Sequence, residues 1–334
     1  PTMPGRFRVV ATDFLEEASI EAEVLGELAS VTCGLARDES ELAELLDTAD
    51  ALMLFHDVTY LSDKSFAKAP RCRGVVRAGV GFNNVDLAAA GKRGIAVCNV
   101  PDYGSEEVAD HAIMLLLAVA RHLVPFDQSI RRGEWDALKF LSVPRLRGKT
   151  LGLVGCGRIG TATALRAKAF GLDVVFFDPY VRPGHEKAIG VRRAWRLDEL
   201  LEQSAFVSLH CYLDARTHHL INADALARMP RDSVLVNTAR GPVVDQQALL
   251  NALDSGHLMG AGIDVFEREP LDDDRLRLHP RVVLTPHSAF YSAEGFVELR
   301  RKTAEEVRRL LLNEPPLNLV NREHVVEPRF TLGK

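Results

Sequence analysis

The sequence predicts an α/β protein made of two doubly wound domains, each built on a parallel sheet. Three observations support this prediction. A chain of 334 residues suits two domains better than one. Short apolar runs rich in Val and Ile alternate with amphipathic stretches, which is typical of a parallel sheet with crossover helices. Two longer helical stretches interrupt this alternation and divide it into two series.

The first series fills the N-terminal third of the chain. Its apolar runs predict strands at Phe7–Ala11, Ala51–Phe55, Gly74–Ala78 and Ile95–Cys98. The amphipathic stretches between them predict helices at Glu16–Ala29, Glu39–Asp47 and Asp86–Lys92.

The second series repeats the pattern with more strands. We expect these strands, with helices between them, at Thr150–Val154, Asp173–Phe177, Phe206–His210, Ser233–Asn237, Ala261–Asp264 and Val282–Thr285. This series therefore predicts a second parallel sheet.

The two longer helical stretches, Ser105–Leu123 and Ser292–Asn313, are expected to connect the domains. A chain that crosses twice makes the first domain discontinuous. We therefore expect one domain from residues 1–104 and 291–334 and another from residues 105–290. A ligand is expected in the cleft between them. An arm follows the first crossover, with Trp135 and Phe140 as expected packing anchors.

Composition and charge exclude several classes of partner. A formal net charge of −5 gives no field that would attract nucleic acid or an anionic membrane. The most apolar stretch, Ile113–Ala120, is far shorter than the roughly 20 residues that span a bilayer. Pro1–Arg8 lacks the apolar core of a signal peptide. Five scattered cysteines predict free thiols in a reducing compartment, so we expect a cytoplasmic protein without nucleic-acid or membrane partners.

A glycine-rich motif follows the first strand of the second series. The strand runs directly into Gly155-Cys156-Gly157-Arg158-Ile159-Gly160, and a helical pattern from Thr161 to Phe170 follows. The first two glycines permit a tight turn and close approach of a pyrophosphate. The third lets helix and strand pack closely, and the helix N-terminus offers free N–H groups to the anion. Alone, this motif is a weak signal, because glycine turns are common.

An acidic residue in the right place strengthens the signal. The next strand ends at Asp178, eighteen residues past Gly160, where a carboxylate would accept hydrogen bonds from the adenosine ribose of NAD. The carboxylate also favours NAD over NADP because it repels a 2′-phosphate, although Arg182 lies close enough to weaken this preference. The alternative is a structural glycine turn with Asp178 as a cap.

Three later strands each lead to a residue suited to 2-oxo acid chemistry. Arg240 ends one loop, and a planar guanidinium binds a carboxylate bidentately and polarises the adjacent carbonyl. Glu269 and His287 follow the next two strands. A histidine can protonate the alkoxide as hydride arrives, and a carboxylate on its other nitrogen fixes the tautomer. Singly, each residue fits a structural role better; their arrangement after consecutive strands predicts catalysis.

These segments resemble the D-isomer-specific 2-hydroxyacid dehydrogenases, and most closely the C-terminal-binding-protein branch of that family. The likeness covers nearly the whole chain. It implies a Rossmann NAD-binding domain, a flavodoxin-like substrate domain and, by analogy, a homodimer. It is carried by Cys98-Asn99-Val100-Pro101, Phe177-Asp178-Pro179-Tyr180, Leu209-His210-Cys211, His218-His219-Leu220-Ile221-Asn222, Asn237-Thr238-Ala239-Arg240-Gly241 and Pro286-His287-Ser288-Ala289-Phe290-Tyr291-Ser292.

The resemblance implies roles for individual residues. Arg240, Glu269 and His287 would be catalytic, with His287 as the proton donor. Asp264 would lie near the nicotinamide carboxamide and Val80 near the reactive end of the cofactor. With the glycine motif, the other expected cofactor contacts are Gly155, Gly157, Arg158, Ile159, Gly160, Asp178, Cys211, Thr217, Thr238 and Ala239.

The expected substrate contacts lie in both halves of the chain. The loop of Gly79, Val80 and Gly81 resembles the family's substrate loop, whose backbone N–H groups receive the substrate carboxylate. Arg77 either assists it or is a strand-end ion-pair partner. Phe290 departs from the resembled branch, which has tryptophan there in the pocket wall, so the substrate's identity does not carry over. No metal is expected, because neither His218-His219 nor His210-Cys211 has a third ligand at matching spacing.

The leading hypothesis is an NAD-dependent oxidoreductase that interconverts a small 2-oxo acid and the D-2-hydroxy acid. The alternative is an NAD(H)-sensing corepressor or binding protein with vestigial dehydrogenase activity. It ranks lower because the chain keeps every catalytic residue type. Formate dehydrogenase is disfavoured, since that related group carries glutamine where this chain has Glu269.

Overall fold

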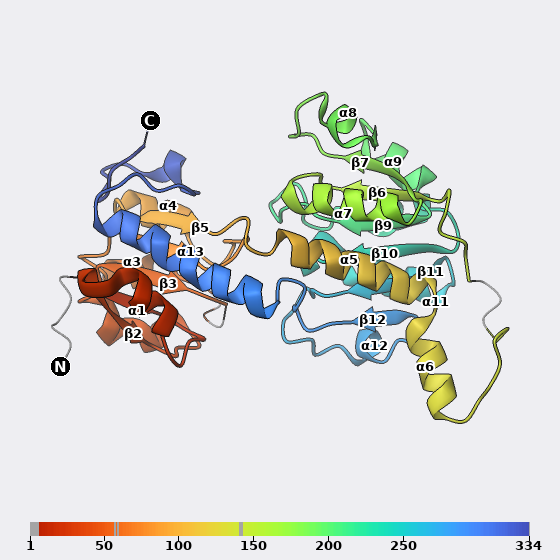
Figure 1. Ribbon diagram of the computed structural model, residues 1–334, viewed down its shortest axis with the longest axis horizontal. Helices are drawn as coiled ribbons and strands as arrows, with labels where there is room; N and C mark the ends of the chain where they lie inside the picture. The colour runs from red at the N-terminus through yellow and green to blue at the C-terminus, as the bar shows by residue number, and fades with distance from the viewer. Residues whose placement is uncertain (1–6, 57, 59, 140–142, 334) are drawn as a thin grey trace. The chain divides into compact units, whose positions relative to one another are not determined.

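The computed structural model describes residues 7–56, 58, 60–139 and 143–333. The chain divides into two compact units, one formed by Pro1–Gly104 with Ser292–Lys334 and the other by Ser105–Tyr291. Phe140, expected as a packing anchor, lies outside the described residues. Each unit is an α/β fold on a parallel sheet, as predicted (Figure 1).

The first unit contains a five-stranded sheet with the order β2-β1-β3-β4-β5, in which every pair is parallel. This is the strand order of flavodoxin-like folds. The strands are short and mostly buried, as expected when helices cover both faces of a sheet. They are β1 Phe7–Ala11, β2 Ala29–Cys33, β3 Ala51–Leu54, β4 Gly74–Arg77 and β5 Ala96–Asn99.

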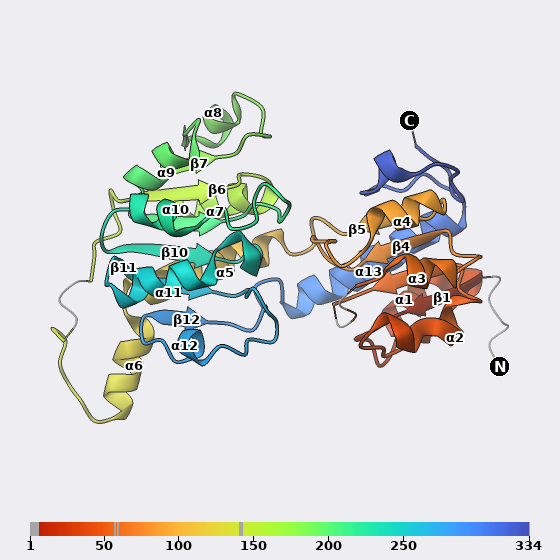
Figure 2. The same cartoon turned by 180° about the vertical axis from the view of Figure 1, so that it is seen from behind.

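Helices cover both faces of this sheet. On one face, α13 packs against α1 and contacts β3 and β4 (Figure 1). On the other face lie α2, α3 and α4 (Figure 2). Their buried side chains Leu46, Phe66 and Ala90 belong to one core cluster with Leu52 and Val75 of the strands. The helices are α1 Ser19–Leu25, α2 Ala43–Leu46, α3 Asp63–Ala67, α4 Leu87–Lys92 and α13 Ala293–Leu311.

The second unit contains a seven-stranded parallel sheet with the order β12-β11-β10-β9-β6-β7-β8. Counted from β6, this is the Rossmann order extended by one strand, and its topology switches between β6 and β9. The strands are β6 Thr150–Val154, β7 Asp173–Phe177, β8 Arg192–Arg193, β9 Phe206–Leu209, β10 Ser233–Asn237, β11 Leu258–Ile263 and β12 Val282–Leu284.

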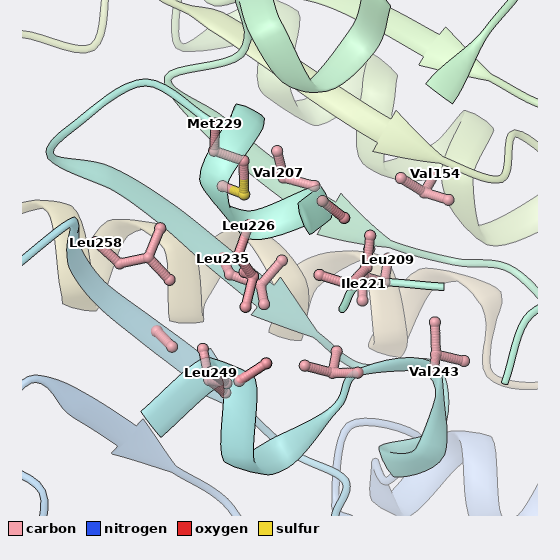
Figure 3. Close-up of a cluster of buried hydrophobic side chains, with 14 of the residues drawn as sticks. Val154, Val207, Leu209, Ile221, Leu226, Met229, Leu235, Val243, Leu249 and Leu258 are labelled. Atoms are coloured by element: carbon pink, nitrogen blue, oxygen red, sulfur yellow. The ribbon is translucent and has the colours of Figure 1, made fainter. Parts of the chain in front are cut away.

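Helices again cover both faces. The helices α5 and α7 lie side by side on one face (Figure 1), and α9, α10 and α11 lie on the other (Figure 2). Figure 3 shows the core beneath α10 and α11, where Leu226, Met229 and Leu249 meet Val207 and Leu235. The helices are α5 Ser105–Ala120, α6 Leu123–Arg131, α7 Arg158–Ala169, α8 His185–Ile189, α9 Leu197–Gln203, α10 Ala223–Arg228, α11 Gln246–Asp254 and α12 Asp274–Arg277.

Local sequence fixes where many of these helices begin. A side-chain oxygen directly before the helix accepts an N–H of the first turn, which would otherwise have no partner inside the helix. Ser62 does this for α3, Asp86 for α4, Asn222 for α10, Asp245 for α11, Asp273 for α12 and Ser292 for α13.

The structure corrects several predicted elements. The helix expected over Glu16–Ala29 ends at Leu25. The edge strand β2 follows it and was not predicted, because its alternately exposed residues do not form an apolar run. The short edge strand β8 was also missed. The helix after the glycine motif begins at Arg158, not Thr161, because the motif itself forms its first turn. The stretch Ser105–Leu123 breaks at His122, whose φ of 49° is left-handed.

The structure also bears on the cysteines and on the most apolar helices. All five cysteines are free, and Cys72, Cys98 and Cys156 are buried. Within the described residues, no single helix is long and apolar enough to cross a membrane. The pair α5 and α6 reaches that length and composition only together, and it bends by 59°.

Candidate functional site

The glycine motif forms a tight loop at the switch point of the seven-stranded sheet. Gly155 has a φ of 95°, and a Cβ there would lie 2.7 Å from the carbonyl carbon of His210, at the end of β9. A Cβ on Gly160 would lie 2.3 Å from the carbonyl oxygen of Gly155. Neither position tolerates a side chain. A Cβ on Gly157 would meet nothing within 4 Å, so the loop is packed beneath and open above.

Asp178 stands at the end of β7 beside this loop. Its Oδ2 accepts the N–H of Cys156 at 2.8 Å, and its Oδ1 accepts the N–H groups of Tyr180 at 2.8 Å and Val181 at 3.2 Å. The carboxylate is therefore held by backbone on both sides. Arg182, whose charge was expected to weaken the preference for NAD over NADP, is exposed.

A second arginine, which the sequence analysis missed, lies under the same turn. Arg193 of β8 donates from Nη2 to the carbonyl oxygens of Asp178 at 2.7 Å and Val181 at 2.8 Å. Its side chain is only 5% exposed, and its guanidinium lies over the rings of Phe176 and Trp195, with Cζ 5.4 Å and 4.4 Å from their centroids. A prediction of β8 as a strand next to β7 would have placed Arg193 beside Asp178.

The other expected cofactor residues differ in how their polar groups are used. The hydroxyl of Thr238 is buried and has no hydrogen-bond partner among the described residues. The hydroxyl of Thr217 instead donates to the carbonyl of Tyr212 at 2.6 Å within its own loop. Burial, together with the charges of Asp178 and Asp214, raises the pKa of the Cys211 thiol to about 11. Cys211 is therefore a neutral thiol near pH 7.

These features fit a dinucleotide. The first turn of α7, which includes Arg158, Ile159 and Gly160, has N–H groups without partners inside the helix, and they suit a pyrophosphate. The open side of Gly157 leaves room for it. The orphaned hydroxyl of Thr238, followed by Ala239, offers a further donor or acceptor at the same edge of the sheet.

Arg240 stands on a turn that β10 positions. The side chain of Asn237 donates to the carbonyl of Arg240 at 2.9 Å and accepts the N–H of Ala239 at 3.0 Å, which fixes the turn. A Cβ on Gly241 would lie 1.9 Å from the backbone of Phe266. The absence of a side chain at Gly241 thus allows the arginine turn to pack directly against the segment that leads to Glu269.

Glu269 and His287 form a hydrogen-bonded pair. The distance between Glu269 Oε2 and His287 Nδ1 is 2.7 Å, and the histidine and glutamate side chains are 39% and 36% exposed. Glu269 Oε1 also accepts the N–H of Phe266 at 3.0 Å. Burial raises the pKa of Glu269, but hydrogen bonds and the charges of His287 and Arg240 outweigh it and lower the pKa below its ordinary value. The pairing leaves Nε2 of His287 as the nitrogen that faces away from Glu269.

Asp264 lies at the end of β11 and is completely buried. Its carboxylate accepts the N–H groups of Ser288 at 2.9 Å and Ala289 at 3.0 Å, directly after His287. Its expected contact with the nicotinamide carboxamide stays a prediction, while its observed contacts are with the histidine loop.

Phe290 and the loop of the first unit complete the expected substrate residues. The ring of Phe290 meets the His287 imidazole edge to face, with centroids 6.4 Å apart. In the first unit, Arg77 covers Gly79 and donates to the carbonyl of Ala78 at 2.6 Å. The carbonyl of Val80 accepts from Asn99 at 2.7 Å, and Gly81 follows it directly. Their roles as substrate contacts stay predictions.

The paired histidines do not form a metal centre with other side chains. His219 hydrogen-bonds to Glu267 at 2.9 Å, and His218 stacks on His219. No group of three or more potential ligands is present in the part of the chain that the structure describes.

Comparison with known proteins identifies the family of the chain. Residues 113–289 match the family model for the NAD-binding domain of the D-isomer specific 2-hydroxyacid dehydrogenases. The chain belongs to this family. A glyoxylate reductase from Korarchaeum cryptofilum is 45% identical over 266 residues, which are 78% of this chain and 79% of that protein. The predicted family, Rossmann domain and NAD cofactor are thus confirmed, and the narrower C-terminal-binding-protein branch stays a prediction.

Two further comparisons span the dehydrogenase chain more completely. A D-3-phosphoglycerate dehydrogenase from Methanocaldococcus jannaschii is 36% identical over 327 residues, 98% of this chain but only 61% of that protein. An NADPH-dependent glyoxylate/hydroxypyruvate reductase from Sinorhizobium meliloti, solved with NADP and malonate, superposes with a TM-score of 0.84 at 30% identity, covering 97% of this chain and 99% of that one. NADP thus occurs as a cofactor among proteins of this fold.

Proposed function

We propose that this 2-hydroxyacid dehydrogenase interconverts a small 2-oxo acid and the corresponding D-2-hydroxy acid, with NAD(H) as the cofactor. The observation that carries the proposal is the Glu269–His287 pair, at 2.7 Å, beside the turn of Arg240. Relatives named glyoxylate reductase support the substrate class. When bound, NADH supplies the hydride.

The residues of this pair have separable roles. Because Nδ1 of His287 is hydrogen-bonded to Glu269, Nε2 is left to face the substrate oxygen. In reduction, the imidazolium donates its Nε2 proton to the oxygen of the substrate as negative charge develops there. The carboxylate of Glu269 holds the ring orientation and stabilises the imidazolium. In oxidation, the neutral imidazole takes the same proton back.

Arg240 supplies the recognition of the substrate carboxylate. Its guanidinium has the fork geometry that matches a carboxylate, and the Asn237 turn holds its backbone. We propose that Arg77, Gly79, Val80 and Gly81 contribute further contacts to the same carboxylate, and that Phe290 lines the pocket for the side chain of the substrate.

The test is a panel of 2-oxo acids, including glyoxylate, hydroxypyruvate and pyruvate, incubated with NADH while its absorbance is followed. The chirality of the product is then determined with a chiral column. We expect turnover of at least one acid to the D-enantiomer. NADH binding without turnover of any acid would contradict the proposal and favour the NAD(H)-sensing corepressor.

We also propose that the enzyme is a homodimer. The support is the arm that follows α5, where Leu123, Ile130 and Leu138 are exposed and Trp135 is 90% exposed. Exposed apolar side chains gathered on one arm are typical of an association surface. Sedimentation equilibrium of the wild type and of Trp135→Asp, which should shift the dimer toward the monomer, tests it. A monomeric wild type would refute it.

A further inference from the structure

His111 lies on α5, the first helix of the second unit, six residues after its start, and its side chain is mostly buried. Its Nε2 is 2.9 Å from the hydroxyl of Thr285 and 3.6 Å from Oδ1 of Asp264. The Thr285 hydroxyl is 2.5 Å from the same Oδ1. A carboxylate accepts hydrogen bonds, so Thr285 donates to Asp264 and accepts from the Nε2–H of His111.

This chain of hydrogen bonds ends at the loop that carries His287. Asp264 accepts the N–H groups of Ser288 and Ala289, one on each carboxylate oxygen. Its own carbonyl accepts the N–H of His287 at 2.8 Å. Asp264 therefore accepts hydrogen bonds from three consecutive residues of this loop.

These hydrogen bonds hold a backbone conformation that is unfavourable by itself. His287 has a φ of 53°, in the left-handed region that a residue with a Cβ adopts only at an energetic cost. A strained conformation of this kind persists only where surrounding contacts impose it. This φ sets the direction in which the imidazole leaves the backbone, and hence its approach to Glu269.

We propose that His111 is a positioning residue for His287: through Thr285 and Asp264, it maintains the left-handed loop that directs the imidazole toward Glu269. The inference rests on the proposed function only in taking His287 as the proton donor. Burial lowers the pKa of His111, although the charge of Asp264 opposes the shift. A neutral imidazole with its proton on Nε2 is the form that this geometry requires.

Four substitutions separate the hydrogen bonds from the packing. Thr285→Val keeps the shape of the side chain but removes the hydroxyl, whereas Thr285→Ser keeps the hydroxyl. His111→Phe removes the donor, whereas His111→Gln retains an N–H near the position of Nε2. The matched control is His257→Phe. The Nε2 of His257 also donates a hydrogen bond, to the carbonyl of Leu226 at 3.0 Å, but His257 precedes β11 at the opposite edge of the sheet.

The first measurement does not depend on activity. Hydrogen exchange of the full-length protein should show the Ser288 and Ala289 amides exchanging at least about tenfold faster in Thr285→Val and His111→Phe. Thr285→Ser, His111→Gln and His257→Phe should exchange like the wild type. Unchanged exchange in Thr285→Val and His111→Phe, or faster exchange throughout the second unit, would overturn the proposal.

The second measurement is turnover. In Thr285→Val and His111→Phe, kcat should fall roughly 10- to 100-fold because the proton donor is misdirected, with the dissociation constant for NADH changed by less than about threefold. An equal loss in His257→Phe, or a loss confined to NADH affinity, would also overturn it. If no 2-oxo acid is turned over by the wild type, the proposed function fails, and hydrogen exchange still decides the role of His111.

Discussion

The guanidinium of Arg193 lies beneath the peptide that carries Asp178, and donates to its carbonyl oxygen at 2.7 Å. The side chain of Asp178 is bound by the backbone of its own turn and of the glycine loop. The acid expected to bind the adenosine ribose is thus held at both its carbonyl and its carboxylate.

Replacement of the buried arginine should therefore weaken NADH binding without direct contact with the cofactor. Arg193→Met keeps the bulk but loses two charge-assisted hydrogen bonds, so we expect roughly tenfold weaker NADH binding and little change in kcat at saturation. Fluorescence titration measures it. Arg192→Met, on the exposed neighbour that pairs with Asp173, is the control. If NADPH binding suffers more than NADH binding, Arg193 contacts the 2′-phosphate instead.

The charge of Asp178 should set the coenzyme preference. The wild type should bind NADH at least about tenfold more tightly than NADPH, because the carboxylate repels a 2′-phosphate and accepts from the ribose. Asp178→Asn should narrow that ratio, whereas Asp173→Asn, at the other end of the same strand, should leave it unchanged. Titration of all three proteins with both cofactors decides it. A wild type that favours NADPH would contradict the assignment.

Arg240→Lys tests carboxylate recognition. The lysine retains the charge but cannot form the bidentate fork, so kcat/KM for 2-oxo acids should fall about 100-fold while NADH affinity stays nearly intact. Arg231→Lys is the matched control, because Arg231 precedes β10 and Arg240 follows it. Steady-state kinetics measure the effect. Near-normal turnover in Arg240→Lys would remove the arginine from the substrate site.

Glu269→Gln tests the coupling to His287. The pKa of Glu269 lies below its ordinary value, so the carboxylate remains charged through mildly acidic and neutral pH and stabilises the imidazolium there. Its removal should make reduction decline at lower pH than in the wild type and should make oxidation rise at lower pH, each by roughly one pH unit. The pH dependence of kcat/KM in both directions provides the measurement.

A second glutamate–histidine pair provides the control for that experiment. Glu267 lies two residues from Glu269 and hydrogen-bonds to His219 at 2.9 Å. Glu267→Gln should leave both pH profiles in place, and His287→Gln should be nearly inactive in both directions. Profiles of Glu269→Gln that match the wild type would mean that the observed hydrogen bond does not act in catalysis.

Phe290→Ala tests the wall of the pocket. The ring lies edge to face with His287, so its loss should change the relative rates for 2-oxo acids with bulky apolar side chains by about tenfold, and those for glyoxylate less. Tyr291→Ala, on an exposed neighbour, serves as the control. The measurement is kcat/KM across the panel. A uniform loss for every acid would assign Phe290 to packing.

Periodicity and motif order were sufficient to predict both sheets and the placement of Arg240, Glu269 and His287, because these features are local to each strand and the loop after it. The edge strands β2 and β8 were missed because a short run with polar residues lacks the apolar pattern that predicts a strand. Pairing with the neighbouring strand makes these segments extended. Arg193 was lost with β8. His111 and Thr285 are far apart in sequence, so only the packing of α5 on the sheet brings them together.

The first unit is assembled from both ends of the chain, which has a consequence for its synthesis. Helix α13 packs on β3 and β4, and the side chain of Asn321 bonds to the backbone of Val97 and Ile95. The contiguous second unit has all its strands once Leu284 has left the ribosome, whereas the five-stranded sheet must wait for residues more than 200 positions away. During translation, β1 to β5 are therefore made well before α13, and the face of their sheet that α13 covers stays open until that helix has been synthesised.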